Sequence, residues 1–195
     1  MTDQAEYCLW APMNDQVYRN YHDTEWGVPE YDSRALWEKL QLDGFQAGLS
    51  WRTILYKRDA FREEFDEFDP ERLSRWSDER IETALQNPGI IRSPTKIKAL
   101  VGNAKAFLEF QNNGENFSDW MWSYVGGTPI VNSWQNFKNA PVKSPESERL
   151  SKDLKTRGFK FCGPVIVYAF MQAVGMINDH ETHCPRHKAV QAMTR

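Results

Sequence analysis

The sequence predicts an all-α protein, because apolar residues repeat at helical spacing and capping residues mark several helix starts. The clearest repeat runs from Pro94 to Gln111, where one helix face collects six apolar side chains: Ile97, Leu100, Val101, Ala104, Phe107 and Leu108. No Asn-Gly or Asp-Gly turn separates alternating, strand-like runs, since Asp43-Gly44 lies inside a helical pattern. We therefore expect a bundle of helices.

Further helices are predicted from their end signals. Residues 126–147 are rich in Gly, Pro, Asn and Ser, so we expect a long surface loop there. Around it, Ser or Asp caps, Pro in a first turn and a terminal Gly are typical of helix ends. The predicted helices run from Asp32 or Ser33 through Leu36 and Leu40, from Ser77 to Leu85, from Ser144 to Gly158, and from Pro164 to Ile177.

Length and composition indicate a single soluble domain over residues 1–195. The first six residues are acidic and no long apolar stretch follows, so we expect neither a secretory signal nor a membrane span. Three cysteines, an odd number, favour metal ligands and a core thiol over a disulfide framework. These features predict a cytoplasmic protein, and Cys162 is expected to be the buried thiol.

The net charge of −3 does not indicate a basic nucleic-acid-binding protein, so any DNA site must be a local patch. One candidate is the turn Asn87-Pro88-Gly89-Ile90-Ile91-Arg92, which joins two predicted helices as a helix-hairpin-helix. Backbone amides after Gly89 can hold a DNA phosphate, and Arg92, Lys96 and Lys98 add positive charge. The local pattern alone favours the alternative, an ordinary helical hairpin with a Pro-Gly turn.

Four residues near the two chain ends form a candidate metal site: Cys8, His22, His180 and Cys184. Thiolates and neutral imidazoles suit tetrahedral zinc, and closed sites of four protein ligands are structural. His180 and Cys184 are four residues apart and can share one helix face. The spacing is not that of a zinc finger, however, and His183 and His187 are rival ligands, so the pattern alone leaves zinc open.

Aromatic and acidic residues cluster in two stretches, 18–29 and 43–51. The chain has 8 Trp, 7 Tyr and 11 Phe, and rings beside polar or glycine-rich segments can line a pocket for a flat ligand. Asp43 lies on a predicted helix with Leu36, Leu40 and Leu42, which makes it a candidate buried carboxylate. The alternative is a solvated Asp beside a helix break, the commoner environment for this residue.

Six sequence blocks, in order and covering nearly the whole chain, resemble bacterial 3-methyladenine DNA glycosylase I. They are Tyr-His-Asp-x-Glu-Trp-Gly-Val-Pro at 21–29, Gln-Ala-Gly-Leu-Ser-Trp at 46–51, Gly-Ile-Ile-Arg at 89–92, Gly-Asn-Ala-Lys-Ala at 102–106, Arg-Gly-Phe-Lys-Phe at 157–161, and Phe-Met-Gln-Ala-x-Gly-x-x-Asn-Asp-His at 170–180.

This resemblance implies a monofunctional helix-hairpin-helix DNA glycosylase, which flips a damaged nucleotide and hydrolyses its N-glycosidic bond. The implied substrate is double-stranded alkylated DNA, the product is free 3-methyladenine, and a monomer is expected. A terminal part bound by zinc (1–30 and 160–195) would adjoin a central helix-hairpin-helix part (about 31–125). The implied zinc ligands are Cys8, His22, His180 and Cys184.

The resemblance also assigns the base pocket and the DNA contact. The pocket falls on Tyr18, Tyr21, Trp26 and Trp51, with Trp10 as a wall, and the pocket carboxylate falls on Asp43. Gly89, Arg92 and Lys96 are the expected DNA-binding residues.

Three departures from the family pattern accompany this assignment: Asp43 replaces the usual Glu, Ser93-Pro94-Thr95 replaces a basic, glycine-containing exit from the hairpin, and Ala169 replaces a hydroxyl residue. They leave two alternatives, a catalytically weakened or inactive zinc-containing DNA-binding module, and a glycosidase for another modified base. Asp119 is a second candidate carboxylate, although its position also suits the N-terminus of a helix.

Overall fold

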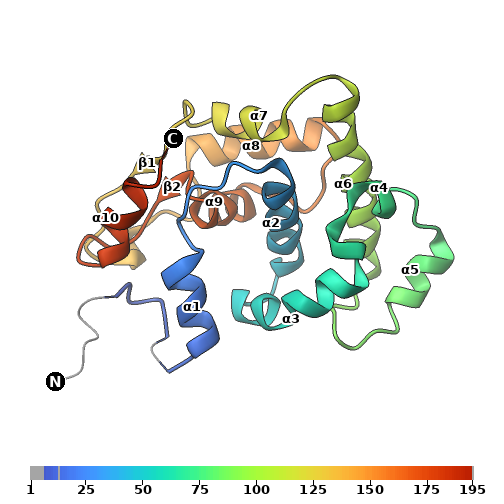
Figure 1. The fold of residues 1–195 in the computed structure, drawn as a ribbon, viewed down its shortest axis with the longest axis horizontal. Helices are drawn as coiled ribbons and strands as arrows, with labels where there is room; N and C mark the ends of the chain where they lie inside the picture. The colour runs from blue at the N-terminus through green and yellow to red at the C-terminus, as the bar shows by residue number, and fades with distance from the viewer. Residues whose placement is uncertain (1–6, 13, 195) are drawn as a thin grey trace.

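The computed structural model describes residues 7–12 and 14–194, and its regular structure there is almost entirely helical (Figure 1). The α-helices are α1 (Gln16–Thr24), α2 (Ser33–Gln46), α3 (Trp51–Glu64), α4 (Pro70–Leu73), α5 (Asp78–Ala84), α6 (Pro94–Asn112), α7 (Phe117–Ser123), α8 (Pro145–Thr156), α9 (Pro164–Ala173) and α10 (Pro185–Gln191). Short 3-10 turns lie at Asp66–Phe68 (η2) and Phe137–Asn139 (η3). The predicted all-α class is confirmed.

Capping residues begin the helices where the sequence predicts. Asp32 caps α2 by accepting from the amides of Arg34 and Ala35. Ser144 opens α8 in a capping box with Ser147, so the predicted start of this helix is also confirmed. Each cap satisfies amide groups that a helix N-terminus leaves without an intrahelical partner.

The helix predicted from Pro164 to Ile177 ends earlier, at Ala173, which corrects its C-terminus. Gly175 follows in the left-handed region (φ +72), and a Cβ there would lie 2.5 Å from the backbone nitrogen of Pro29. Only glycine fits this close approach without strain. The chain then turns into β2 (Ile177–Asn178) instead of continuing the helix.

The loop predicted over residues 126–147 contains regular structure. It includes β1 (Ile130–Val131), which pairs in parallel with β2, so that Ile130 lies opposite Ile177. It also contains η3 and the first residues of α8. Side chains of Asn132 and Trp134 each donate to Asp179 Oδ1 at 2.7 Å. These long-range contacts, absent from local patterns, hold the segment against the C-terminal part of the chain.

The centre of the molecule is α2, which packs against α3, α6, α7 and α9 (Figure 1). Its Leu36 and Trp37 are completely buried, and Trp37 Nε1 donates to the carbonyl of Phe68 at 2.8 Å. Burial of such side chains stabilises the bundle by roughly 1.5–3 kcal/mol each. Because α2 is fixed on all sides, the side chains at its C-terminal end have defined positions. Among the described residues, no helix is long and apolar enough to cross a membrane.

Candidate functional site

All five aromatic residues of the predicted pocket line one cavity of about 260 Å³. These five residues come from the N-terminal segment, from α1 and the turn after it, and from α3. The cavity is also lined by Phe137 from η3 together with Ala169, Gln172 and Ala173 from α9. The aromatic lining is Trp10, Tyr18, Tyr21, Trp26, Trp51 and Phe137. The structure therefore brings together residues that are far apart in sequence.

The aromatic rings of the cavity contact one another in both stacked and edge-to-face pairs. Tyr18 and Tyr21, three residues apart on one face of α1, lie nearly parallel with centroids 6.3 Å apart. Trp51 lies 5.3 Å from Tyr21, and Trp10 meets Trp26 edge to face at 4.7 Å. A planar ligand in this cavity would have π faces and ring edges available for stacking.

The position of α1 beside the cavity is held by Asp15. Its carboxylate caps the helix by accepting from the amide of Tyr18 at 3.0 Å, and it also accepts from Arg52 Nε at 2.6 Å and Tyr56 Oη at 2.7 Å. Hydrogen bonds from Arg52 and Tyr56 lower the pKa of Asp15 to about 2. This one carboxylate therefore ties α1 to α3 and places Tyr18 relative to Trp51.

Asp43 is the buried carboxylate that the helical pattern suggested, with an exposure of 2%. Its Oδ1 accepts from Lys39 Nζ at 2.6 Å, whereas Oδ2 is buried without a hydrogen-bond partner in the described part of the chain. Burial raises the pKa of Asp43, and the positive charge of Lys39 opposes that rise. The cavity thus contains a carboxylate oxygen that is able to accept a hydrogen bond.

Sequence reasoning missed Lys39, although its spacing of four residues from Asp43 was a signal for an ion pair on one helix face. Its ammonium lies 4.0 Å from the centroid of the Trp51 ring and also lines the cavity. Gln172 was also missed. Its amide donates to Asp179 Oδ2 at 2.7 Å, a contact that only the fold creates.

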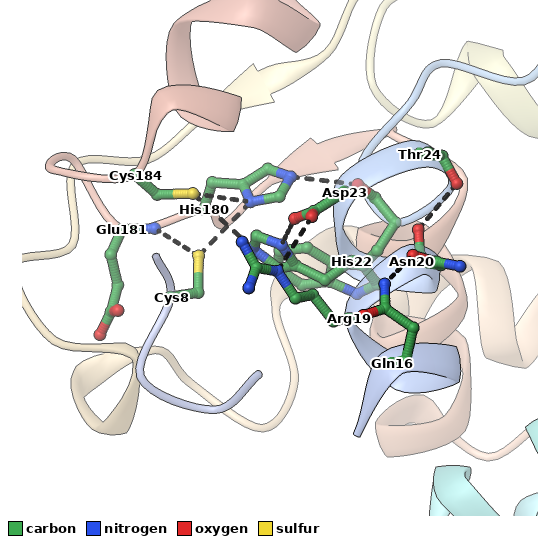
Figure 2. Close-up of polar contacts among 11 residues, drawn as sticks. Cys8, Gln16, Arg19, Asn20, His22, Asp23, Thr24, His180, Glu181 and Cys184 are labelled. Atoms are coloured by element: carbon green, nitrogen blue, oxygen red, sulfur yellow. Dashed lines mark hydrogen bonds and ion pairs between the residues drawn. The ribbon is translucent and has the colours of Figure 1, made fainter. Parts of the chain in front are cut away.

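The four predicted metal ligands lie together and are fully buried (Figure 2). Their ligand atoms all lie within 4.8 Å of one another. Cys8 Sγ is 3.4 Å from His180 Nδ1, and Cys184 Sγ is 3.7 Å from His22 Nε2. Two thiols and two imidazoles at these distances form a group that could hold a metal ion.

The other nitrogen of each imidazole has a protein partner. His22 Nδ1 lies 2.8 Å from Asp23 Oδ1, and His180 Nε2 lies 3.0 Å from the carbonyl oxygen of Trp26. Such contacts orient ligand rings and fix which nitrogen faces the metal. A Cβ at Gly27 would lie 2.8 Å from His180 Nε2, so the glycine also leaves room for this ring.

The charges of the group also fit a cation. A hydrogen bond with Cys184, together with burial, raises the pKa of Cys8, whereas the same contact lowers the pKa of Cys184. Burial lowers the pKa of His180, which favours its neutral form. Without a central cation the two thiols oppose one another's ionisation, and a divalent ion would stabilise both thiolates.

The structure tests two expectations about the metal site: how His180 and Cys184 come together, and whether other histidines belong to the group. The expectation that His180 and Cys184 share a helix face is wrong, because His180 follows β2 and Cys184 is the residue that precedes α10. A turn brings them together instead. The rival histidines lie outside the group, since His183 Nε2 contacts the carbonyl of Tyr7 at 3.1 Å and His187 Nε2 that of Asn132 at 2.8 Å. Cys162 is the buried thiol predicted.

The predicted hairpin joins α5 to α6. Gly89 donates its amide to Asn87 Oδ1 at 2.7 Å, and its carbonyl accepts from Lys57 at 2.9 Å. Arg92 is exposed. Lys96, by contrast, donates to the carbonyls of Phe45 at 2.8 Å and Ala47 at 2.7 Å, at the end of α2. Its ammonium therefore fastens the hairpin to the segment that precedes Trp51.

The structure also places Ser93 and Pro94, which depart from the family pattern, and Asp119, the second candidate carboxylate. Ser93 caps α6 by accepting from the amide of Lys96 at 3.4 Å, and Pro94 occupies the first turn. The two residues thus form a regular helix start. Asp119 is exposed in the first turn of α7 and is not among the residues that line the cavity in the described chain.

The chain is similar to glycosylases over most of its length. A family model described as methyladenine glycosylase matches residues 10–187. Curated relatives include DNA-3-methyladenine glycosylase from Haemophilus influenzae, 47% identical over 91% of this chain and 96% of the relative. DNA-3-methyladenine glycosylase 1 from Escherichia coli is 47% identical over 92% of this chain and 95% of the relative.

Solved structures have the same fold. A crystal structure of 3-methyladenine DNA glycosylase I aligns with a TM-score of 0.91 at 48% identity and covers 92% of this chain and 98% of that one. The enzyme from Staphylococcus aureus, described for its recognition of 3-methyladenine, aligns with a TM-score of 0.85 at 40% identity and covers 89% and 92%.

Proposed function

This chain belongs to the methyladenine glycosylase family, and on that premise we propose that it is a DNA-3-methyladenine glycosylase. It hydrolyses the N-glycosidic bond of 3-methyladenine in alkylated double-stranded DNA, acts as a monomer, and releases the free base. The observation that carries this proposal is the aromatic cavity with a buried carboxylate oxygen, Asp43 Oδ2, that has no protein partner in the described chain.

The chemistry of the lesion matches this cavity. Adenine methylated at N3 carries a positive charge in DNA and is already a good leaving group, so the pocket has to recognise the flipped base and admit water. Electron-rich rings stabilise a stacked cation by about 1–2 kcal/mol once water is removed. Asp43 Oδ2 accepts the exocyclic amino hydrogen, a charge-assisted bond. Unmodified adenine lacks the charge and gains less.

DNA is held at the hairpin between α5 and α6. Amides near Gly89 and the guanidinium of Arg92 contact phosphates, which positions the duplex without reading its sequence. Lys96 contributes indirectly, because its ammonium is bonded to the two carbonyls at the end of α2. Through that contact the phosphate-binding hairpin and the base pocket keep a constant separation.

The metal group holds zinc in a structural role. Cys8, His22, His180 and Cys184 supply two thiolates and two imidazoles, the donor set that zinc prefers in closed sites. Zinc would supply a cross-link between the two ends of the chain. His22 is on α1, the helix that carries Tyr18 and Tyr21, so the cross-link also supports one wall of the pocket.

The test is release of 3-methyladenine from methylated duplex DNA, measured chromatographically for the wild type and a matched pair of tryptophan variants. Trp51→Leu removes a ring from the cavity, whereas Trp76→Leu removes one that packs on Phe65, elsewhere in the core. Loss of stacking worth about 1–2 kcal/mol should slow release roughly 5- to 30-fold for Trp51→Leu only.

The same assay separates the alternatives. A wild-type protein that binds the duplex and releases no base would be a binding module, and release of a different modified base would identify a glycosidase of other specificity. Equal losses in the two variants would show that Trp51 acts through stability alone.

A further inference from the structure

The Lys39–Asp43 ion pair places a cation inside a cavity assigned to a cationic base. Lys39 Nζ lies 2.6 Å from Asp43 Oδ1 and 4.0 Å from the centroid of the Trp51 ring. The lysine side chain is 16% exposed and the aspartate side chain 2% exposed. The pair is therefore held inside the protein, where charges interact more strongly than in water.

We propose that Lys39 is a positioning and specificity-determining residue of the base pocket, which keeps Asp43 as an ionised acceptor and occupies one face of Trp51. This inference rests on the proposed glycosylase function. It adds a lysine to the recognition apparatus and assigns the pocket an ion pair that carries no net charge before the base arrives.

Lys39 fixes the orientation of the Asp43 carboxylate. Because Lys39 binds Oδ1, only Oδ2 of Asp43 remains for a ligand. An ion pair between residues four apart on one helix also restricts the rotamers of both side chains. A base that donates an amino hydrogen to Asp43 therefore meets one defined oxygen of this carboxylate.

Lys39 also favours the ionised form of the Asp43 carboxylate. A carboxylate as deeply buried as Asp43 loses its charge easily unless a cation lies beside it. Burial raises the pKa of Asp43 and lowers the pKa of Lys39, and each charge opposes the shift of the other. If the ammonium were removed, the pKa of Asp43 would rise further, and the protonated form, which accepts less well, would persist to higher pH.

No other group in the described structure replaces this ammonium. On the neighbouring α1 and α3, Glu25 and Arg58 bind one another, with Arg58 Nη2 at 3.0 Å from Glu25 Oε1. The α9 wall of the cavity is formed by uncharged residues. Burial raises the pKa of the two phenols on α1, Tyr18 and Tyr21, which therefore stay neutral.

The Lys39 ammonium also changes how strongly the cavity attracts a cationic base. The Lys39 ammonium lies over the Trp51 ring, so a cationic base gains less from stacking on that ring than it would if no cation were already there. The paired Asp43 likewise attracts a cationic base less than a lone carboxylate would. The ion pair thus weakens the preference of the pocket for a cationic base, and it keeps Asp43 able to accept a hydrogen bond over a wide pH range.

The experiment compares single-turnover release of 3-methyladenine between pH 6 and 8.5 for the wild type and four variants. Lys39→Met and Lys39→Gln remove the charge, Lys39→Arg keeps it, and Lys152→Met is the control on the exposed side of α8. Two neutral variants are used so that one informative protein remains if the other does not fold. Thermal unfolding checks each protein.

For the neutral variants, release should fall about tenfold for each pH unit below the raised pKa of Asp43. The wild type, Lys39→Arg and Lys152→Met should change less than about threefold over the same range. Parallel profiles for the wild type and both neutral variants, whatever their absolute rates, would overturn the proposal, because a purely structural role predicts a loss that is uniform in pH.

Different results would contradict the role of Lys39 and the glycosylase function on which it rests. Absence of release by the wild type would contradict the glycosylase function and not the role of Lys39. In that case binding of free 3-methyladenine, followed by quenching of tryptophan fluorescence, provides the same pH comparison. A pH-dependent affinity confined to the neutral variants would support the proposal, and identical dependence in all five proteins would refute it.

Discussion

Replacing Asp43 by Asn should destabilise the protein through Lys39 as well as impair base release. The carboxylate is 2% exposed, and its contact with the ammonium is 2.6 Å long. Asn preserves the shape but leaves a positive charge buried without an anion, and breaking a buried pair costs about 3–5 kcal/mol. Since Lys39 retains 16% exposure and some solvation, we expect the lower end, about 3 kcal/mol.

The assay is urea unfolding at pH 7.5 of the wild type, Asp43→Asn, Lys39→Met and the double variant. Removing both charges eliminates the uncompensated ion, so the double variant should recover about 2 kcal/mol relative to Asp43→Asn. Base release should stay low, because Asn offers the base only a neutral acceptor in place of the charged carboxylate. The exposed pair Lys143–Glu148 is the control, with an expected coupling of about 0.5 kcal/mol or less for Lys143→Met with Glu148→Gln.

Additive losses at Lys39 and Asp43, with a coupling below about 0.5 kcal/mol, would refute this reasoning. Such a result would mean that solvent reaches the pair well enough to screen it. Full recovery of base release in the double variant would remove Asp43 from recognition altogether.

Three further predictions follow from other parts of the structure. Chelation of the metal, or Cys184→Ser, should lower stability by at least about 3 kcal/mol, which is roughly 6–12 °C in Tm; under half an equivalent of zinc with unchanged Tm would contradict this. Arg92→Ala should reduce the salt dependence of duplex binding by about one phosphate contact, whereas Lys96→Met should lower stability and leave that slope unchanged. Gly175→Ala should cost more than about 2 kcal/mol in urea unfolding, and Gly48→Ala, with open space around its Cβ, about 1 kcal/mol; equal costs would argue against the clash with Pro29.

Much of the helical structure was predictable because its causes are local. Ser144 caps α8 through a residue three positions away, and the apolar repeat of α6 follows from helical geometry alone. Chemistry specific to residue type was predictable as well. Two cysteines and two histidines indicated a metal site before their proximity was known, and the order of the motif blocks indicated the family.

The ends of elements depended on distant partners. The helix predicted to reach Ile177 stops at Ala173, and Gly175 follows with φ +72 at a position where a Cβ would lie 2.5 Å from the backbone nitrogen of Pro29, a residue almost 150 positions away. The segment 126–147 reads locally as a loop. Its strand exists because β2 offers a partner for Ile130.

The amino-acid sequence by itself predicted the helices from local spacing, and its motif blocks indicated the family and, through that resemblance, the four candidate metal ligands. Only the tertiary structure decided how those residues are used. Lys96 was predicted to bind DNA, and the fold also places its ammonium against the carbonyls of Phe45 and Ala47 at the end of α2. Lys39 and Asp43 form a buried ion pair in the lining of the cavity, and burial, which changes the energetic consequences of charge, is a property of the packed chain.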